Sequence, residues 1–337
     1  MEIIRTSDRQ YFKRCRVLWD FTSKIRQNYE PIERIEALDF GTAMHSAMEA
    51  YYDPKTWGDK VVMETNSMAA FLIAIKEVQQ KVRIGALDFE IRFEELKALG
   101  IGMLEHYFLW APKRDQFRPI LVEIEFEVPI PGMNGEVVYQ GRIDLVVEDE
   151  QGRYWLVDHK TTAQMADTEW LALDDQCSSY AWAIKQQLGL NVSGVIYNEL
   201  RKKAPRIPPV LKNGRLSVNK SIDTTYEMYL EEVQRKGFKV EEYAGVLEYL
   251  KESPKEFVRR TRVTYGPRVL PIVEQRIQAE AREMLAWGKP EPVAIYPTPS
   301  RFNCNGCNFF RPCLALLEGY DPQSILDELY ERRPTSA

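Results

Sequence analysis

The sequence predicts an α/β fold in which helices flank a central mixed sheet. In the first third of the chain, apolar residues recur every three or four positions, which is typical of amphipathic helices. Between residues 121 and 160 the pattern changes to period-two alternation rich in β-branched residues, with Pro and Gly in the turns. A helical stretch at 168–188 then precedes an apolar strand at 192–200, the order expected of an α/β core.

The helices of the first third are expected at 6–26, 42–52, 67–82 and 89–110. Ser7 is a plausible N-cap for the first helix, because its hydroxyl can accept a hydrogen bond from a free backbone N–H of the first turn. Thr42, with Gly41 before it, is expected to start the second helix. The other two stretches repeat apolar residues over several turns. Residues 1–120 should therefore be mainly helical.

The strands are expected at 121–128, 138–147 and 153–160, as a meander that continues into the helix at 168–188 and the strand at 192–200. Residues 201–215 are rich in Pro and basic side chains and predict a long surface loop. Helices should resume at 224–236, ended by Gly237, and at 272–287, ended by Gly288. We expect one domain with four consecutive parts: the helical part at 1–120, the α/β core at 121–200, a basic loop and helices at 201–296, and a cysteine segment at 297–337.

Composition excludes several classes of protein. The 337 residues are 45% hydrophobic and 28% charged, which is ordinary for a globular protein. We find no run of about 18 apolar residues and no apolar signal-peptide core after Met1, so we expect a cytoplasmic protein without membrane contact. The net charge of −5 argues against a broadly basic surface, although a local basic track would suffice to bind nucleic acid.

The stretch from Gly141 to Lys160 carries the clearest chemical pattern. Folded as an antiparallel hairpin, it places Asp144 opposite Asp158, with Cβ atoms about 4.5 to 5.5 Å apart. The strand pleat places Asp158 and Lys160 on one face and His159 on the other. Two carboxylates beside an ammonium group suit Mg²⁺ or Mn²⁺ next to a reacting phosphate. The alternative is a pair of exposed strand aspartates, one of them paired with Lys160.

Four motifs in order resemble the RecB-type branch of the PD-(D/E)XK nucleases, which includes AddB-like nucleases, CRISPR-adaptation nucleases and phage exonucleases. They cover most of residues 41–180. The motifs are Gly41-Thr42-Ala43-Met44-His45, Gly141-x-x-Asp144, Asp158-His159-Lys160 and Gln176-x-x-x-Tyr180. The resemblance implies a single nuclease domain with a restriction-endonuclease-like core.

The resemblance also implies roles for particular residues. His45, Asp144 and Asp158 would bind the metal together with the backbone carbonyl of His159, and Lys160 would be the catalytic lysine. Gln176 and Tyr180, four residues apart on one helical face, would support the site or touch the DNA backbone.

Two of these assignments leave alternatives open. The family tends to have an acidic residue on the preceding strand, where Glu123, Glu125 and Glu127 alternate, and we select Glu125. An isolated histidine on a helix more often packs or is solvated than binds metal. A cap at Gly41-Thr42 would hold His45 in the first turn and favours the ligand role.

Three of the five cysteines form the pattern Cys304-x2-Cys307-x5-Cys313, and Cys15 lies near the other end of the chain. Four thiolates can hold a tetrahedral zinc or a [4Fe–4S] cluster. Structural zinc usually takes two short pairs, whereas one remote cysteine plus this run resembles the iron-sulfur staple of part of the family. Asn303, Asn305 and Asn308 argue against ordinary buried thiols. Cys177 is expected to pack as a small apolar residue.

Two groups of basic residues could contact DNA. Arg201, Lys202 and Lys203 begin the Pro-rich loop, with Arg206, Lys212 and Arg215 further along, and Tyr197 nearby could stack on a base. Arg259, Arg260 and Arg262 form the second group. The alternative for the loop is a solvated charged segment.

The sequence therefore predicts a metal-dependent DNA nuclease that uses Mg²⁺ or Mn²⁺ and is stabilised by a [4Fe–4S] cluster. We expect an exonuclease acting on single-stranded DNA or DNA ends, in a bacterium or encoded by its phage, with recombination, replication or CRISPR-adaptation partners. One alternative is a catalytically inactive DNA-binding or scaffold protein, against which the complete set of His45, Asp144, Asp158 and Lys160 argues. The other is a zinc-stabilised interaction module.

Overall fold

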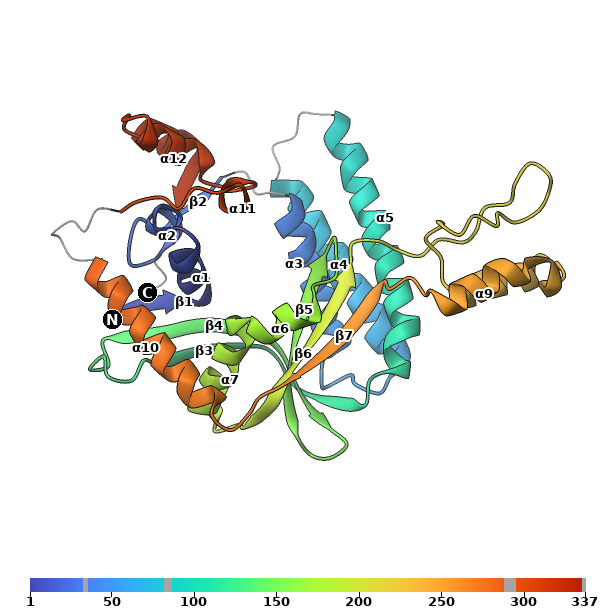
Figure 1. Ribbon diagram of the computed structural model, residues 1–337, viewed down its shortest axis with the longest axis horizontal. Helices are drawn as coiled ribbons and strands as arrows, with labels where there is room; N and C mark the ends of the chain where they lie inside the picture. The colour runs from blue at the N-terminus through green and yellow to red at the C-terminus, as the bar shows by residue number, and fades with distance from the viewer. Residues whose placement is uncertain (33–35, 82–86, 288–294, 335–337) are drawn as a thin grey trace.

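The computed structural model describes residues 1–32, 36–81, 87–287 and 295–334, and its centre is a mixed β-sheet with the strand order β1-β4-β5-β6-β7, in which β3 also pairs with β4 (Figure 1). The strands are β1 (Glu2–Arg5), β3 (Phe117–Pro129), β4 (Val137–Asp149), β5 (Tyr154–Thr162), β6 (Val192–Arg201) and β7 (Val258–Thr264). Strand β1 runs parallel to β4 and β5 runs parallel to β6, whereas the other pairs are antiparallel. The predicted α/β class with a mixed sheet flanked by helices is confirmed.

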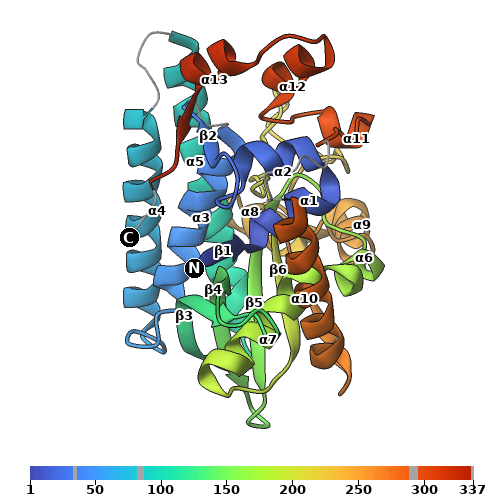
Figure 2. The same ribbon diagram turned by 90° about the vertical axis from the view of Figure 1, so that its left-hand side faces the viewer.

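Helices cover both faces of the sheet, as Figure 2 shows. One face packs against α3 (Glu36–Tyr51), α4 (Lys60–Lys81) and α5 (Leu87–Trp110), through Leu145 and Val157 among others. The other face packs against α7 (Asp175–Leu188) and α10 (Val269–Trp287), through Val146 and Leu156. Successive strand residues therefore enter opposite cores, as the two-residue period of a pleated strand requires.

Strand β4 changes partner along one of its edges, and this change creates a gap in the sheet. Its first residues pair with β1, up to Gln140 opposite Arg5, and its last residues pair with β5, from Leu145 opposite Val157 onward. The segment 141–144 lies between the two partners. Because β1 is parallel and β5 antiparallel to β4, the carboxyl ends of both strands point toward this gap. Ligand sites in α/β sheets form preferentially where strand carboxyl ends meet in this way.

Each of the two helices predicted at 6–26 and 168–188 is divided into two shorter helices in the structure. Residues 6–26 form α1 (Thr6–Arg14) and α2 (Arg16–Thr22), separated by Cys15 in an extended conformation. The N-cap of α1 is Arg5, whose backbone N–H donates to Asp8, so the assignment of Ser7 as N-cap is wrong. Residues 168–188 form α6 (Thr168–Leu173) and α7, separated by Asp174, whose carboxylate caps α7.

Strands β1 and β7 were not predicted. Strand β1 has four residues, too few to establish a period. Strand β7 carries Arg259, Arg260 and Arg262, so its sequence predicts a basic cluster rather than alternation, although it pairs with β6 along seven residues from Val258 to Thr264. Residues 258–264 therefore adopt a strand because they pair with β6, which is distant in sequence.

Between β6 and β7 the chain forms a smaller helical unit with its own apolar cluster, which includes Leu216, Tyr229 and Leu247. It contains α8 (Tyr226–Arg235), a short 3₁₀ helix (Val240–Tyr243) and α9 (Ala244–Glu252), and Gly237 follows α8 with a positive φ of 69°. A 3₁₀ helix (Ala111–Lys113) also follows α5.

The segment of α2 and β2 (Tyr29–Pro31) and the segment of α11 (Arg301–Cys304), α12 (Phe310–Leu317) and α13 (Gln323–Leu329) lie together above the sheet (Figure 2). Strand β2 pairs with β8 (Tyr330–Arg332), and α2 packs against the segment containing α11, α12 and α13. Gly288, predicted to end α10, lies outside the described residues. Across the part of the chain that the structure describes, no helix is both long and apolar enough to cross a membrane.

Candidate active site

The hairpin formed by β4 and β5 has the predicted register. Leu145 lies opposite Val157 and Val146 opposite Leu156, so one further step brings Asp144 level with Asp158. The backbone N–H of His159 donates to Asp144 Oδ2 at 2.8 Å, which fixes this carboxylate at the gap in the sheet. The hairpin therefore delivers both aspartates to the place where β4 changes partner.

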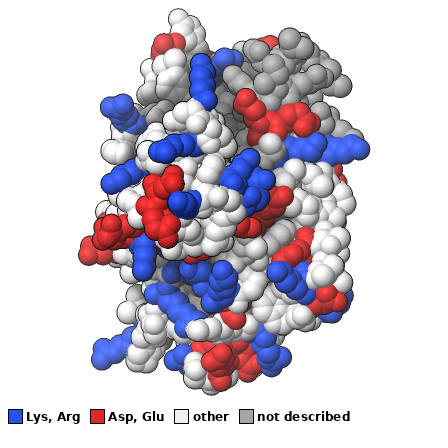
Figure 3. Space-filling view, turned by 90° about the vertical axis from the view of Figure 1, so that its right-hand side faces the viewer, with Lys and Arg blue, Asp and Glu red and all other residues white. Residues whose placement is uncertain are grey.

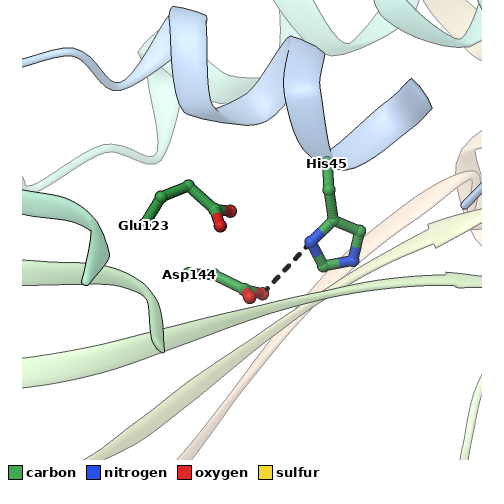
Figure 4. Close-up of side chains that lie close together, drawn as sticks. All are labelled: His45, Glu123 and Asp144. Carbon is green, nitrogen blue, oxygen red and sulfur yellow. Dashed lines mark ion pairs between the residues drawn. The ribbon is translucent and has the colours of Figure 1, made fainter. Parts of the chain in front are cut away.

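Three side chains at this gap could hold one metal ion. His45 from α3, Glu123 from β3 and Asp144 from β4 each offer a ligand atom, and these atoms lie within 4.8 Å of one another (Figure 4). His45 Nδ1 lies 3.5 Å from Asp144 Oδ2. Two carboxylates and an imidazole suit Mn²⁺, and the carboxylates also suit Mg²⁺.

The acidic residue of β3 in this group is Glu123, whereas the sequence led us to select Glu125. Glu123 has a φ of 46°, which is uncommon for any residue other than glycine. The pairs on either side, Val122 with Leu145 and Ile124 with Ile143, place Glu123 level with Asp144. Glu125 pairs with Arg142 instead. No sequence pattern marks a positive φ at a glutamate, and unusual backbone angles of this kind cluster at functional sites.

The carboxylates at the gap repel one another in the absence of a cation. Burial raises the pKa of Glu123 to about 7, and Asp144 adds to the increase, although Arg142, 2.8 Å from Glu123 Oε2, opposes it. Glu123 Oε2 and Asp158 Oδ2 are also among the buried oxygens for which the described residues provide no hydrogen-bond donor of good geometry. A divalent cation would offset both the charge repulsion and the unmet hydrogen-bonding capacity, so the donor set fits such an ion.

Next to this group, the buried Asp158 pairs with Lys160, whose side chain is partly exposed. Lys160 Nζ lies 3.0 Å from Asp158 Oδ2, and Asp158 is only 5% exposed. Burial raises the pKa of Asp158, whereas the Lys160 ammonium lowers it. Burial lowers the pKa of Lys160, but Asp158 outweighs it and the net shift is upward, so the lysine stays charged. Asp158 lies outside the three-residue group defined by the 4.8 Å limit.

Gln176 and Tyr180 extend this pair along α7. Gln176 Nε2 donates to the Tyr180 hydroxyl at 2.8 Å, and Lys160 Nζ lies 3.4 Å from Gln176 Oε1. Four of the predicted site residues thus form a continuous chain from Asp158 to Tyr180. Cys177, in the same helix, is fully buried in the core, as expected of a small apolar residue.

His45 does not lie in the first turn of its helix, where the sequence led us to expect it. Helix α3 begins at Glu36, so His45 lies in the third turn, and Gly41 and Thr42 are inside the helix rather than at its cap. The capping argument was therefore wrong, because the helix continues upstream through residues that carry no cap signal. His159 is 4% exposed and directs its side chain into the opposite core, as the pleat predicts.

Gly141 is required by close packing. A Cβ atom there would lie 2.5 Å from Phe126 Cζ and 2.8 Å from Thr6 Oγ1, so a side chain would push α1 or β3 away. The close approach of α1 forms one wall of an open cavity of about 450 Å³ beside the metal group. Most of its lining residues carry polar side chains; they are Arg5, Thr6, Ser7, Gln10, Glu125, Gln140, Gly141, Arg142, Gln176 and Tyr180.

The basic group on β7 is mostly engaged inside the protein. Arg260 has a side chain only 11% exposed and pairs with Asp115. Arg259 pairs with Glu199 at 2.7 Å and donates to the carbonyl of Ala166, in the loop after Lys160. Arg262 is exposed. Two of the three arginines predicted to contact DNA therefore form ion pairs with carboxylates within the protein.

The basic group after β6 is more accessible. Arg201 lines a second open cavity, of about 480 Å³, with Gln164 and Lys255. Lys203 pairs with Asp223 at 2.6 Å, and Lys202 lies over the ring of Phe40. Tyr197, suggested for base stacking, is 1% exposed and lies in the core. On the face that carries α9, Lys and Arg are interspersed with Asp and Glu, so this face is not uniformly basic (Figure 3).

The four predicted cluster cysteines are brought together at the chain ends. Cys15, Cys304, Cys307 and Cys313 all line one apolar cavity of about 130 Å³, and none forms a disulfide. A tetrahedral zinc would hold its sulfurs about 3.8 Å apart, given Zn–S bonds of about 2.3 Å. No three of these thiols, all in the described chain, have sulfurs within 4.8 Å of one another.

Comparison with known families agrees with this arrangement. The family model for the PD-(D/E)XK nuclease superfamily matches residues 6–313, which include every motif residue and all four cysteines at the chain ends. No curated protein matches the sequence significantly. The match covers nearly the whole chain.

Proposed function

We propose, on the premise that this chain belongs to the PD-(D/E)XK nuclease superfamily, that it is a deoxyribonuclease of the RecB-type branch that degrades single-stranded DNA or DNA ends. Members of the superfamily are nucleases that use divalent metals. The observation that carries the proposal is the group of His45, Glu123 and Asp144 beside the Asp158–Lys160 pair. This arrangement combines ligands for a hard cation with a charged lysine at one gap in the sheet.

The chemistry proposed for the site is hydrolysis of a phosphodiester bond. Mg²⁺ or Mn²⁺ bound there would polarise the phosphate and make a water molecule a better nucleophile. His45, Glu123, Asp144 and Asp158 would hold the ion. The Lys160 ammonium, kept charged by Asp158, would stabilise the negative charge that develops as water attacks phosphorus and the bond to the leaving sugar oxygen breaks.

The cavity between α1 and β4 is our proposed path for the DNA backbone. It begins at Gln176, which contacts Lys160, and is lined by amides and hydroxyls that can donate to phosphate oxygens. Arg142 contributes a cation, and Arg201 lies in the second cavity beyond Thr162 at the other end of the site. The preference for ends and the bacterial or phage setting, with recombination, replication or CRISPR-adaptation partners in the cytoplasm, rest on the resemblance of the motifs.

We further propose that the four cysteines at the chain ends hold a [4Fe–4S] cluster. The cavity that the four cysteines share, their free thiols and the Cys304-x2-Cys307-x5-Cys313 pattern support this assignment. A cluster there would tie α1 and α2 to the C-terminal segment, in addition to the β2–β8 pairing.

The test is a nuclease assay on protein purified without oxygen. Labelled linear and circular single-stranded DNA and linear duplex DNA are incubated with Mg²⁺ or Mn²⁺. We expect the linear single strand to be degraded and the circle to be spared. Lys160→Ala should reduce cleavage about 10³-fold, whereas Lys185→Ala, on the exposed side of α7, should not. Equal cleavage by the parent protein and both variants, or no cleavage by any of them, would contradict the proposal.

A further inference from the structure

A buried polar network lies on the face of the sheet that α3 and α5 cover, next to the metal group: the ring of His159, one of its members, lies 6.3 Å from the ring of His45. It joins strands β5, β6 and β7 to α3 and α5 through side chains that are almost completely removed from solvent. Its members are Tyr52, Tyr107, Asp115, His159, Asn198 and Arg260. Buried polar groups are costly unless they are satisfied, so a complete network of this size indicates a specific requirement for geometry.

Asn198 is the centre of the network and is fully buried. Its Oδ1 accepts from Arg260 Nε at 3.1 Å, and because a guanidinium can only donate, this contact fixes which way the amide points. Its Nδ2 therefore donates to His159 Nδ1 at 2.8 Å and to the Tyr107 hydroxyl at 3.0 Å. His159 is held by its side chain while its backbone N–H donates to Asp144. The network thus connects to a proposed metal ligand in one step.

Arg260 connects the same network to the helix that carries His45. Its Nη2 donates to the hydroxyls of Tyr52 at 2.7 Å and Tyr107 at 3.0 Å, and its Nη1 pairs with Asp115. Tyr52 directly follows α3, seven residues after His45, which places the two side chains on one helical face. The Tyr52 ring also stacks on His159, with centroids 5.6 Å apart and an interplanar angle of 18°.

We propose that Arg260 is a positioning residue that sets the distance between His45 on α3 and Asp144 on β4. The proposal rests on the metal site of the proposed function. The ligands come from a helix and from the sheet, so their spacing depends on how α3 sits on the strands. One guanidinium contacts Tyr52, next to that helix, and Asn198, which holds His159 and through it Asp144. Residues that orient metal ligands in this way typically change metal affinity by 10- to 100-fold when altered.

A role in stability alone is a weaker explanation for this arginine. Replacing a buried ion pair by well-packed hydrophobic residues of similar volume often costs little stability, so the Arg260–Asp115 pair is not needed merely to fill the core. Another buried arginine provides a comparison. Arg9 is 2% exposed and contacts Glu280 and Ser179 on the α7 and α10 side, but it touches none of the three metal-group residues.

The experiment measures Mn²⁺ binding to the metal-free protein by electron paramagnetic resonance, without DNA. Two variants perturb the network. The first is Arg260→Gln combined with Asp115→Asn, which leaves no unpaired charge, and the second is Tyr52→Phe, which removes only a hydroxyl. We expect the dissociation constant to rise about tenfold or more for the first and less for the second. The matched control, Arg9→Gln with Glu280→Gln, neutralises a buried ion pair of the same kind and should leave Mn²⁺ affinity unchanged.

Each outcome decides one question. Folded network variants that bind Mn²⁺ as tightly as the parent would overturn the positioning role. His45→Ala separates this failure from failure of the proposed function, because unchanged Mn²⁺ affinity in that variant would mean that the metal site itself is wrongly assigned. An equal loss of affinity in the Arg9 control would attribute the effect to general destabilisation and would also overturn the proposal.

Discussion

The two candidate cation sites of this protein are built in opposite ways. The site at the gap in the sheet uses oxygen and nitrogen ligands on α3, β3 and β4, held by strand register and by a buried network. The site at the chain ends uses four sulfurs, three of them in a segment of short helices. We therefore expect the scaffold of the first site to persist without its cation, and the order of the second to depend in part on the cluster that we propose there.

The free thiols illustrate the difference. Burial raises the pKa of Cys313 to about 11, and the neighbouring Cys15 adds to the increase. Thiols in this state stay protonated near neutral pH, and binding a cation or cluster must release their protons. The free energy of that binding would then contribute to the free energy of folding of the terminal segment.

Removing a ligand of the proposed cluster should have the largest effect on stability, and this effect should be confined to the chain ends. Cys304→Ser is expected to increase amide hydrogen exchange in α12 and α13, with a loss of local stability of roughly 4 kcal/mol, the scale of opening a very long cross-linked loop. Amides of β5 and β6 should stay protected. Cys177→Ser, outside the cluster, is the control. Equal loss of protection in the sheet would show that the two sites are not independent.

At the sheet site, the largest effect should come from Glu123. Glu123→Gln is expected to raise the Mn²⁺ dissociation constant 10- to 100-fold, because it removes a charged ligand from the group. Glu125→Gln, two residues along the same strand, should change it little. Titration calorimetry of the two variants distinguishes them, and a larger effect at Glu125 would restore the assignment made from the sequence.

The sequence predicts the parts of this site that depend on local spacing. The period-two pattern and the turn after Asp149 determine the register of the hairpin, so Asp144, Asp158 and Lys160 could be placed from the sequence. The four-residue spacing of Gln176 and Tyr180 was likewise sufficient to place the two side chains next to each other on one face of a helix.

Features that depend on distant contacts could not be predicted. Glu123 enters the group through a positive φ that strand alternation does not anticipate. Strand β7 forms because β6 provides a partner, and this pairing buries Arg260 where the sequence suggests a free arginine. Tyr197 appeared available for stacking because its burial depends on helices that lie elsewhere in the chain.

The proton equilibrium of Glu123 should make the sheet site sensitive to pH. Its pKa of about 7 in the metal-free protein exceeds its ordinary value of 4.5, so the folded state holds this proton more tightly than the unfolded chain. Metal-free protein should therefore lose stability as pH rises from about 4.5 to 7, while Mn²⁺ affinity should fall up to about tenfold for each pH unit below 7. Calorimetric titrations from pH 5.5 to 8 test this. Glu123→Gln should flatten the dependence, and an unchanged slope in that variant would assign the proton to another group.

Gly141 offers a further test, because a single methyl group added there measures how rigid the scaffold is. In Gly141→Ala the new Cβ would press on the ring of Phe126 and on Thr6. Overpacking of this kind typically costs about 1 to 3 kcal/mol. If the sheet scaffold is rigid, urea unfolding will show this loss and Mn²⁺ affinity will weaken, because β3 carries both Phe126 and Glu123. If α1 yields instead, stability will fall while Mn²⁺ affinity stays near that of the parent, and the metal site will prove to be insulated from the wall of the DNA path.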